Sequence, residues 1–308
     1  MKDAQTEFDP DLTGLDRPQW IDALDEVAED FGAFDPLGPD HQAAFIDAGR
    51  CLVVTFETIQ SVRGTERDEP LGFALTRKHG WSSLSLISDG DTWFRHKAVY
   101  GYFDRLVDDG FFEDFDQVVF FGAGHAGYAA CAYSVAAPGA RVLALRPQST
   151  LDPTIAGWDH RYPKMRRTSF SDRYGYAPDM IDGVDKAFII YNRNDDLDAM
   201  HASHFARPHS NATLLQTTHT DMRLERDIEA MGLTHTLIEA AMDDTLSRQT
   251  WATLWRARRE HVPYLRKLVG SLEGAGRTRM LQAVCEFATT DQQRPFFQKR
   301  LNETAEDA

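Results

Sequence analysis

The feature that most constrains this chain is an apolar run that enters a glycine-rich turn and continues as a run of small residues. Residues 118–128 read VVFFGAGHAGY, and residues 129–137 are mostly Ala, with Cys and Ser. Glycine permits a tight backbone turn, and small side chains let a helix pack closely against a sheet. The segment therefore predicts a buried strand, a tight turn and a helix lying on the sheet.

Predicted strands and helices alternate along much of the chain. This alternation indicates a mostly parallel sheet covered by helices on both faces. Short apolar runs predict strands at 52–56, 82–87, 118–121, 141–145, 187–191 and 213–216. Apolar residues at helical spacing predict helices at 18–31, 40–49, 99–107, 128–137 and 197–205. A polar insertion at 151–185 interrupts this alternation, and from about residue 222 the pattern is helical, with Pro263 kinking or splitting the run.

One interpretation of the glycine turn is a dinucleotide site. Gly122, Gly124 and Gly127 match the G-x-G-x-x-G pattern, in which the start of the helix binds a pyrophosphate. The acidic residue that binds a ribose at the end of the following strand is absent, and Arg146 stands there instead. An arginine at this place would meet a 2′-phosphate, so this interpretation favours NADP as cofactor.

A second interpretation is the nucleophile elbow of a hydrolase, G-x-S-x-G, a strained turn between a strand and a helix. If Gly122 is aligned with the first glycine of that motif, Gly124 takes the place of the serine and Ala126 that of the second glycine. The turn then has the scaffold of an elbow without its hydroxyl group.

The order of elements around the turn resembles the α/β-hydrolase family over roughly residues 50–232. Two strands and a helix precede the turn, and residues 137–148, APGARVLALRPQ, look like the strand that follows the elbow in that family. The resemblance implies a catalytic acid after the next strand, where Asp195, Asp196 and Asp198 are the candidates, with Asp195 preferred. It also implies a histidine after the last strand, which is His219.

His125 is a further candidate because it directly follows Gly124 at the first turn of the helix. A helix N-terminus disfavours a charged imidazole, so we expect His125 to be neutral. A neutral histidine here would serve as a base toward a water molecule or would fill space. No metal is expected, because His201 and His204 lack a third ligand other than His209, beyond Pro208.

These patterns predict an α/β fold with a mostly parallel, doubly wound sheet of α/β-hydrolase type, N-terminal helices and a helical C-terminal extension. We expect three parts: an acidic N-terminal helical segment at 1–49, the hydrolase-like domain at 50–232 and the extension at 233–308. The first 50 residues are strongly acidic and residues 248–279 are basic, so we expect these two regions to attract each other.

Composition excludes several classes of function. A net charge of −15 disfavours binding to nucleic acid or anionic lipid. No apolar run approaches the ~20 residues of a membrane span, and three widely spaced cysteines form no disulfide framework, so we expect a cytoplasmic protein. A phosphoadenosine phosphosulfate reductase is excluded because the sequence has no Ser-Gly-Gly-rich loop and Cys285 lies in an apolar helix.

The function predicted from these residues is that of a degenerate hydrolase without a serine nucleophile, which binds a small molecule or a partner protein and needs no cofactor. Two alternatives stay open. One is an NADP-dependent oxidoreductase that uses the glycine turn, and the other is a hydrolase whose water is activated by His125 or His219. A homo-oligomer is compatible with all three.

Overall fold

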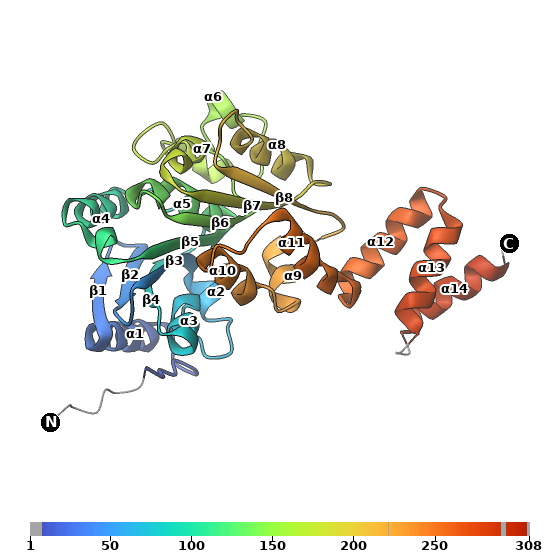
Figure 1. The fold of residues 1–308 in the computed structure, drawn as a ribbon, viewed down its shortest axis with the longest axis horizontal. Helices are drawn as coiled ribbons and strands as arrows, with labels where there is room; N and C mark the ends of the chain where they lie inside the picture. Colours follow the sequence, from blue (N-terminus) through green and yellow to red (C-terminus); the bar gives the residue numbers. More distant parts are fainter. Residues whose placement is uncertain (1–7, 221, 291–293, 307–308) are drawn as a thin grey trace.

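An eight-stranded sheet forms the centre of the computed structural model, which describes residues 8–220, 222–290 and 294–306 (Figure 1). The strand order is β1-β2-β4-β3-β5-β6-β7-β8. The first two strands run antiparallel to their neighbours, and all other neighbouring strands are parallel. The strands are β1 (Gly32–Pro36), β2 (His41–Ile46), β3 (Cys51–Thr58), β4 (Ser82–Ser88), β5 (Gln117–Ala123), β6 (Arg141–Leu145), β7 (Lys186–Asn192) and β8 (Ala212–Thr217).

Helices cover both faces of this sheet, as the alternating pattern predicts. In β5, Val118 and Phe120 belong to one apolar cluster and Val119 and Phe121 to another, because successive side chains of a strand point to opposite faces. The helices are α1 (Arg17–Phe31), α2 (Ile59–Val62), α3 (Leu71–His79), α4 (Lys97–Asp108), α5 (His125–Tyr133), α6 (Pro153–Ala156), α7 (Ala177–Met180), α8 (Asp196–Phe205), α9 (Leu224–Ala230), α10 (Thr234–Met242), α11 (Arg248–Leu254), α12 (Val262–Gly274), α13 (Thr278–Thr289) and α14 (Pro295–Glu306).

The predicted strands and most predicted helices are confirmed, but the helix expected at 40–49 is wrong. Residues 41–46 form β2, which pairs with β4 on one side and with β1 on the other. Ala43, Ala44 and Ile46 are buried in this position. Pairing within the sheet therefore overrides the helix propensity of the alanines. The N-terminal segment thus contributes two strands to the sheet in addition to α1.

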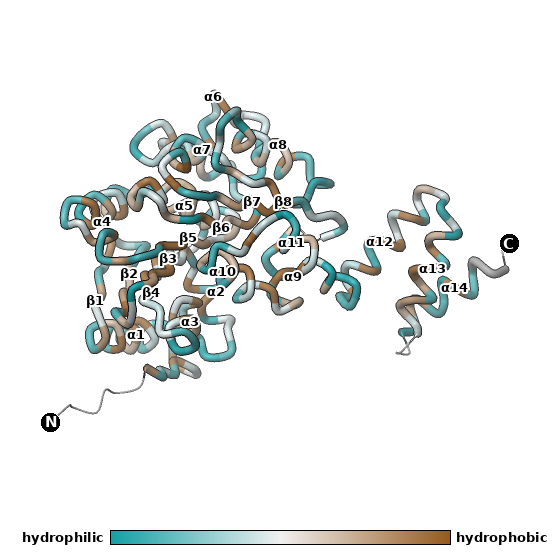
Figure 2. Tube along the Cα trace, viewed as in Figure 1, coloured by the Kyte–Doolittle hydropathy of each residue, from teal (hydrophilic) through white to brown (hydrophobic). Residues whose placement is uncertain are grey.

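The C-terminal helices α12, α13 and α14 project away from the sheet and its covering helices (Figure 1). Pro263 lies in the first turn of α12 and follows a 3₁₀ segment at Trp255–Arg259, so the long helical run is split at this proline. The strands carry the most hydrophobic stretches of the chain, as Figure 2 shows for β3 and β5. Of the described helices, none is long and apolar enough to cross a membrane.

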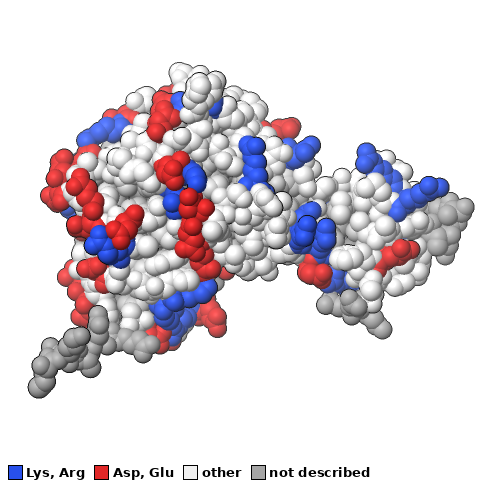
Figure 3. All heavy atoms as spheres, viewed as in Figure 1, with Lys and Arg blue, Asp and Glu red and all other residues white. Residues whose placement is uncertain are grey.

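Charge is distributed unevenly over the molecule. In the view of Figure 3, acidic side chains gather on the main body and basic side chains on the projecting C-terminal helices. Helix α1 lies at the opposite end of the molecule from α12–α14 (Figure 1). The expected attraction between the N-terminal segment and residues 248–279 therefore does not bring the two together within one chain, and that prediction is wrong for the described residues.

Candidate functional site

The glycine turn lies at the carboxyl edge of the sheet, in its interior, because β5 is flanked by β3 and β6. Strand β5 ends at Ala123, and α5 begins at His125. Gly124 between them has φ 59° and ψ −122°, a backbone conformation that favours glycine. Its N–H donates to the Leu145 carbonyl at 2.8 Å, and its carbonyl accepts from the Tyr128 N–H at 3.0 Å. The chain therefore makes a sharp, hydrogen-bonded turn from strand to helix.

Close approach of backbone segments explains the other two glycines. A Cβ atom on Gly122 would lie 2.2 Å from the Ala126 carbonyl oxygen. A Cβ atom on Gly127 would lie 3.0 Å from the carbonyl oxygen of Leu145. Packing within the turn is thus sufficient to account for Gly122 and Gly127, without a bound phosphate.

The guanidinium of Arg146 lies next to Gly124, the position that aligns with the nucleophile of a hydrolase elbow. A Cβ atom on Gly124 would be 3.3 Å from Nη2 of Arg146. The guanidinium makes a two-pronged ion pair with Glu225, with Nε and Nη2 donating at 2.8 and 3.0 Å. Burial opposes the charged form, but this ion pair outweighs it and raises the pKa of Arg146. In the dinucleotide interpretation Arg146 would bind a 2′-phosphate, whereas in the structure its guanidinium binds the carboxylate of Glu225.

His125 is packed between aromatic rings beside this ion pair. Its ring centroid is 5.4 Å from that of Trp93 and 6.0 Å from that of Phe94. Nδ1 lies 3.3 Å from an oxygen of Asp91, whereas Nε2 is buried without a hydrogen-bond partner. Burial lowers the pKa of His125 to about 4, although Asp91 acts in the opposite direction.

The low pKa of His125 predicts a pH-dependent stability. The unfolded histidine takes up a proton near pH 6.5 and the folded one near pH 4, so stability is lost as the pH falls through this interval. About 2 kcal/mol of this loss is expected between pH 7 and pH 5. Burial also lowers the pKa of His41 to about 4 and lowers the pKa values of His201, His204 and His219, so His125→Asn should remove only part of the pH dependence. Urea denaturation at pH 7 and pH 5 measures this. The exposed His209→Asn is the control, and an unchanged pH dependence in His125→Asn would contradict the assignment.

The three aspartates after β7 occupy different environments. Asp195 caps α8, with its side chain accepting the Asp198 N–H at 3.0 Å. Asp196 is exposed, and Asp198 is buried and accepts from Arg161 Nη1 at 2.7 Å. Burial raises the pKa of Asp198 and the contact with Arg161 opposes this change. Asp195 therefore has the role of a helix cap in this structure.

His219 follows β8, as the resemblance implies. Its backbone has φ 57°, and its ring contacts Tyr264 of α12 edge-on at 5.8 Å between centroids. Nδ1 is buried without a partner, and burial lowers the pKa of the ring. Across residues 8–220, 222–290 and 294–306, no hydrogen bond or ion pair connects His219 with Asp195 or His125. The structure thus brings His125, Gly124 and Arg146 together but does not connect the predicted acid and histidine.

A buried polar network that sequence analysis missed lies next to this region. Ser149 Oγ is 3.0 Å from Nδ1 of His201, whose Nε2 lies 3.0 Å from Asp159. The Ser149 N–H donates to the same Nδ1 at 3.2 Å, so the ring proton is on Nε2 and is donated to Asp159. His204 also contacts Ser149 Oγ, at 2.7 Å. The side chains of His201 and Asp159 are completely buried, which indicates a structural connection between the insertion and α8.

His201, His204 and His209, which the sequence places close together, are not arranged around a common point in the structure. His201 and His204 both face Ser149, and their ring centroids are 6.4 Å apart. His209 lies in the loop after α8 with φ 63°. In the part of the chain that the structure describes, no three His, Cys, Asp or Glu side chains are placed to bind a metal ion together.

The insertion 151–185 reaches the glycine turn through aromatic contacts. Tyr162 packs edge-on against Trp93, with ring centroids 4.6 Å apart, and Trp93 in turn contacts His125. The indole N–H of Trp93 donates to the side chain of Gln148 at 3.1 Å. The insertion therefore covers the region around His125 and Arg146.

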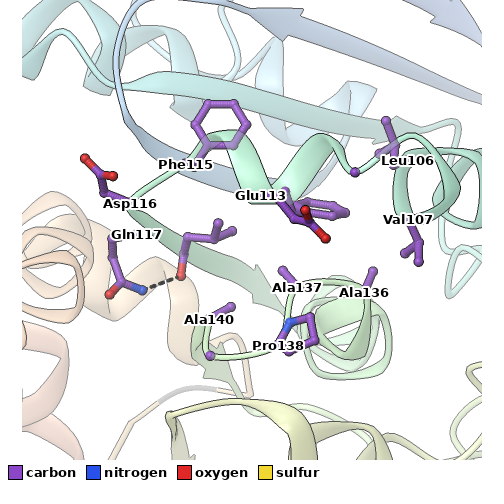
Figure 4. Close-up of a pocket in the computed structure, with 14 residues that line it drawn as sticks. Leu106, Val107, Glu113, Phe115, Asp116, Gln117, Ala136, Ala137, Pro138 and Ala140 are labelled. Atoms are coloured by element: carbon purple, nitrogen blue, oxygen red, sulfur yellow. Dashed lines mark hydrogen bonds between the residues drawn. The ribbon is translucent and has the colours of Figure 1, made fainter.

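A separate cavity of about 340 Å³ lies at the other edge of the sheet, at the start of β5 (Figure 4). Its wall combines apolar side chains with the carboxylates of Glu113 and Asp116, and Asp116 is paired with Arg50. The lining residues are Leu106, Val107, Gly110, Phe112, Glu113, Phe115, Asp116, Gln117, Val118 and 136–140. None of the candidate residues of the glycine turn contributes to it.

Solved structures with a similar fold share little sequence identity with this chain in the examples below. No protein-family model and no curated protein matches the sequence. A carboxyl esterase from the mycorrhizal fungus Tuber melanosporum is 12% identical over 69% of this chain and 85% of its own, with a TM-score of 0.45. The glycosylation-associated Gap123 complex from Streptococcus agalactiae is 14% identical over 68% of this chain and 46% of its own (TM-score 0.44). The capsule O-acetyltransferase of Neisseria meningitidis serogroup A is 11% identical over 63% and 91% (TM-score 0.42).

The strand order decides between the two interpretations of the fold. A dinucleotide unit that begins at the glycine turn would have β5 as its first strand. Here β3 and β4 lie on one side of β5, and β6, β7 and β8 lie on the other, with the glycine turn at the carboxyl edge between them. This arrangement confirms the predicted fold class: the chain has the α/β-hydrolase fold, with a mostly parallel eight-stranded sheet.

Proposed function

We propose that this protein is an α/β-hydrolase-fold protein without serine-nucleophile chemistry, and that it acts by binding a small molecule or a partner protein. The observation that carries the proposal is the absence of a nucleophilic side chain at Gly124, in the turn between β5 and α5. Gly124 supplies no hydroxyl or thiol, and the Arg146–Glu225 ion pair lies over the same position. A guanidinium held by a carboxylate stabilises charge but does not attack an acyl group.

Two further features support a binding role. Aromatic side chains surround His125, and the insertion 151–185 covers them through Tyr162. Apolar and aromatic walls with a few polar groups are typical of ligand sites.

We also propose that the protein is cytoplasmic, because Cys51, Cys131 and Cys285 are free thiols.

The first test is reaction with a fluorophosphonate probe, together with a panel of chromogenic esters. We expect no labelled serine and no ester hydrolysis above that of buffer. The hydroxyl of Ser149 is hydrogen-bonded to His201, which is hydrogen-bonded in turn to Asp159, but Ser149 is completely buried, which prevents attack on a substrate. An active esterase of the same fold serves as the positive control. Stoichiometric labelling of any serine would overturn the proposal.

Restoring the missing hydroxyl gives a second test. Gly124→Ser should fold with a loss of about 1–3 kcal/mol, because a side chain at φ 59° is strained, and Arg146 must also move. Ester hydrolysis should remain feeble, since no hydrogen bond connects His219 and Asp195. Gly139→Ser is the matched control, because Gly139 has φ 83° but no neighbouring atom within 4 Å. Efficient esterase activity in Gly124→Ser would mean that the catalytic machinery is intact, contrary to the proposal.

A hydrolase that uses a water molecule is the second candidate function. His125 favours it, because Nε2 is buried and unpartnered and the low pKa keeps the ring neutral at pH 7. This alternative predicts hydrolysis without probe labelling that is lost in His125→Asn. The binding proposal predicts no hydrolysis in either protein.

The third prediction is that the protein does not bind NADP. The Arg146 guanidinium is already paired with Glu225, so a 2′-phosphate would have to displace a carboxylate. Calorimetric titration with NADPH and NADH should detect no binding up to millimolar concentration. Micromolar binding of NADPH that disappears in Arg146→Ala would support the oxidoreductase alternative instead.

A further inference from the structure

Helix α13 carries two apolar faces. One face is buried in the core and consists of Leu281, Cys285 and Ala288. The other consists of Met280, Ala283, Val284 and Phe287, which we call the outer stripe of α13. Met280 and Phe287 are 52% and 49% exposed and Ala283 is exposed, whereas Val284, at the border of the two faces, is half-buried and packs partly against the core. A helix that packs on a single neighbouring core needs only one of these faces.

The spacing of the outer stripe is that of a helix–helix contact. Its four residues are at positions i, i+3, i+4 and i+7, the pattern by which an amphipathic helix anchors on a partner. Helix α13 is part of the C-terminal group of helices that projects from the main body (Figure 1), so the sheet domain of the same chain does not cover it.

One basic and one acidic residue flank the stripe, so that the charges of one copy can pair with those of a second copy. Arg279 directly precedes Met280, and Glu286 directly precedes Phe287, so both charges lie on the same side of the stripe, one near each end. If two copies of α13 pack in the same direction about a two-fold axis, the charged sides of the two stripes lie on opposite sides of the contact and no ion pair forms between them. If they pack antiparallel, Arg279 of each copy lies near Glu286 of the other.

We propose that the outer stripe of α13 is the interface of a homodimer in which two α13 helices pack antiparallel about a two-fold axis. Met280 lies against Phe287 of the partner subunit, Ala283 lies close to the two-fold axis, and two Arg279–Glu286 ion pairs flank the contact on the same side as Ala283. A two-fold interface uses the same patch on both subunits, as these residues require. The small side chain of Ala283 lets the two helices approach closely at the centre.

The test is the oligomeric state of the full-length chain, measured by sedimentation velocity from submicromolar to tens of micromolar concentration. We expect a reversible monomer–dimer equilibrium. Phe287→Asp should weaken dimerisation at least about tenfold, because it places a charge in the apolar contact with Met280 of the partner subunit. Ile155→Asp is the control, since Ile155 is 41% exposed on the distant helix α6. Circular dichroism confirms that each variant is folded.

A charge exchange separates the proposed arrangement from other associations. Arg279→Glu should weaken the dimer, and Arg279→Glu combined with Glu286→Arg should restore it. Three outcomes would overturn the proposal: a monomer at all concentrations, a dimer that tolerates Phe287→Asp, and open-ended oligomers, which would indicate head-to-tail contacts between different surfaces. Failure of the double variant to recover dimerisation would exclude the antiparallel arrangement.

Discussion

Gly122→Ala should destabilise the protein by about 3 kcal/mol or more, enough to reduce the yield of folded protein sharply. The added methyl group would lie 2.2 Å from the carbonyl oxygen of Ala126 and 2.9 Å from the backbone nitrogen of Gly127. Both neighbours are backbone atoms of the first turn of α5, so neither moves without displacing the helix. That helix is completely buried over most of its length, which leaves little room for adjustment.

Urea denaturation monitored by tryptophan fluorescence measures the change in the free energy of unfolding. Gly101→Ala is the matched control. Gly101 is exposed within α4 and has no neighbouring atom within 4 Å, so this change should stabilise the protein slightly. A Gly122→Ala variant as stable as the wild type would show that the turn is loose, and the close packing inferred for the elbow would then be wrong.

Local sequence patterns were sufficient to predict the elbow. The glycines of the turn, the apolar strand before it and the small residues after it are adjacent in sequence, and their geometry depends mainly on one another. Strands β5 and β6 were predictable for the same reason, because continuous buried strands consist of uninterrupted apolar runs. The spacing of the glycines also placed Gly124 correctly in the sharp turn between β5 and α5.

Features that depend on contacts between distant residues were not predictable. Strand β2 contains alanines that favour a helix, and only its pairing with β1 and β4 makes it a strand. The partner of Arg146 is 79 residues away, so the ion pair with Glu225 has no local signature. Without knowledge of this contact, one interpretation of the turn gave Arg146 the role of binding a phosphate. A search for acidic residues at the start of the helices after β8 would have suggested Glu225.

The buried network around His201 gives the clearest example of such long-range dependence. Ser149 follows β6, Asp159 belongs to the insertion and His201 lies in α8, so the fold alone brings them together. Burial raises the pKa of Asp159, but hydrogen bonds from His201 and Arg161 outweigh it and hold the pKa well below its usual value. The carboxylate is therefore charged at all ordinary pH values and is compensated on both oxygens.

Asp159→Asn should cost about 3–5 kcal/mol, because it breaks a buried, hydrogen-bonded charge network by removing one partner. The carboxylate accepts hydrogen bonds from His201 Nε2 and from Arg161 Nε and Nη2. An amide offers only one acceptor oxygen, and its NH₂ group would face one of these donors. Arg161 retains Asp198, so the loss should fall mainly on the attachment of the insertion to α8.

Chemical denaturation should therefore show a lower free energy of unfolding for Asp159→Asn, and hydrogen exchange should increase first in residues 151–185 and in α8. Asp196→Asn is the matched control, because Asp196 is an exposed aspartate of α8, the helix to which the network attaches the insertion, and its change should stay within about 0.5 kcal/mol. If Asp159→Asn has an equally small effect, the network does not hold the insertion in place. Packing of Tyr162 on Trp93 would then have to provide that attachment by itself, and Tyr162→Ala would be expected to release the insertion instead.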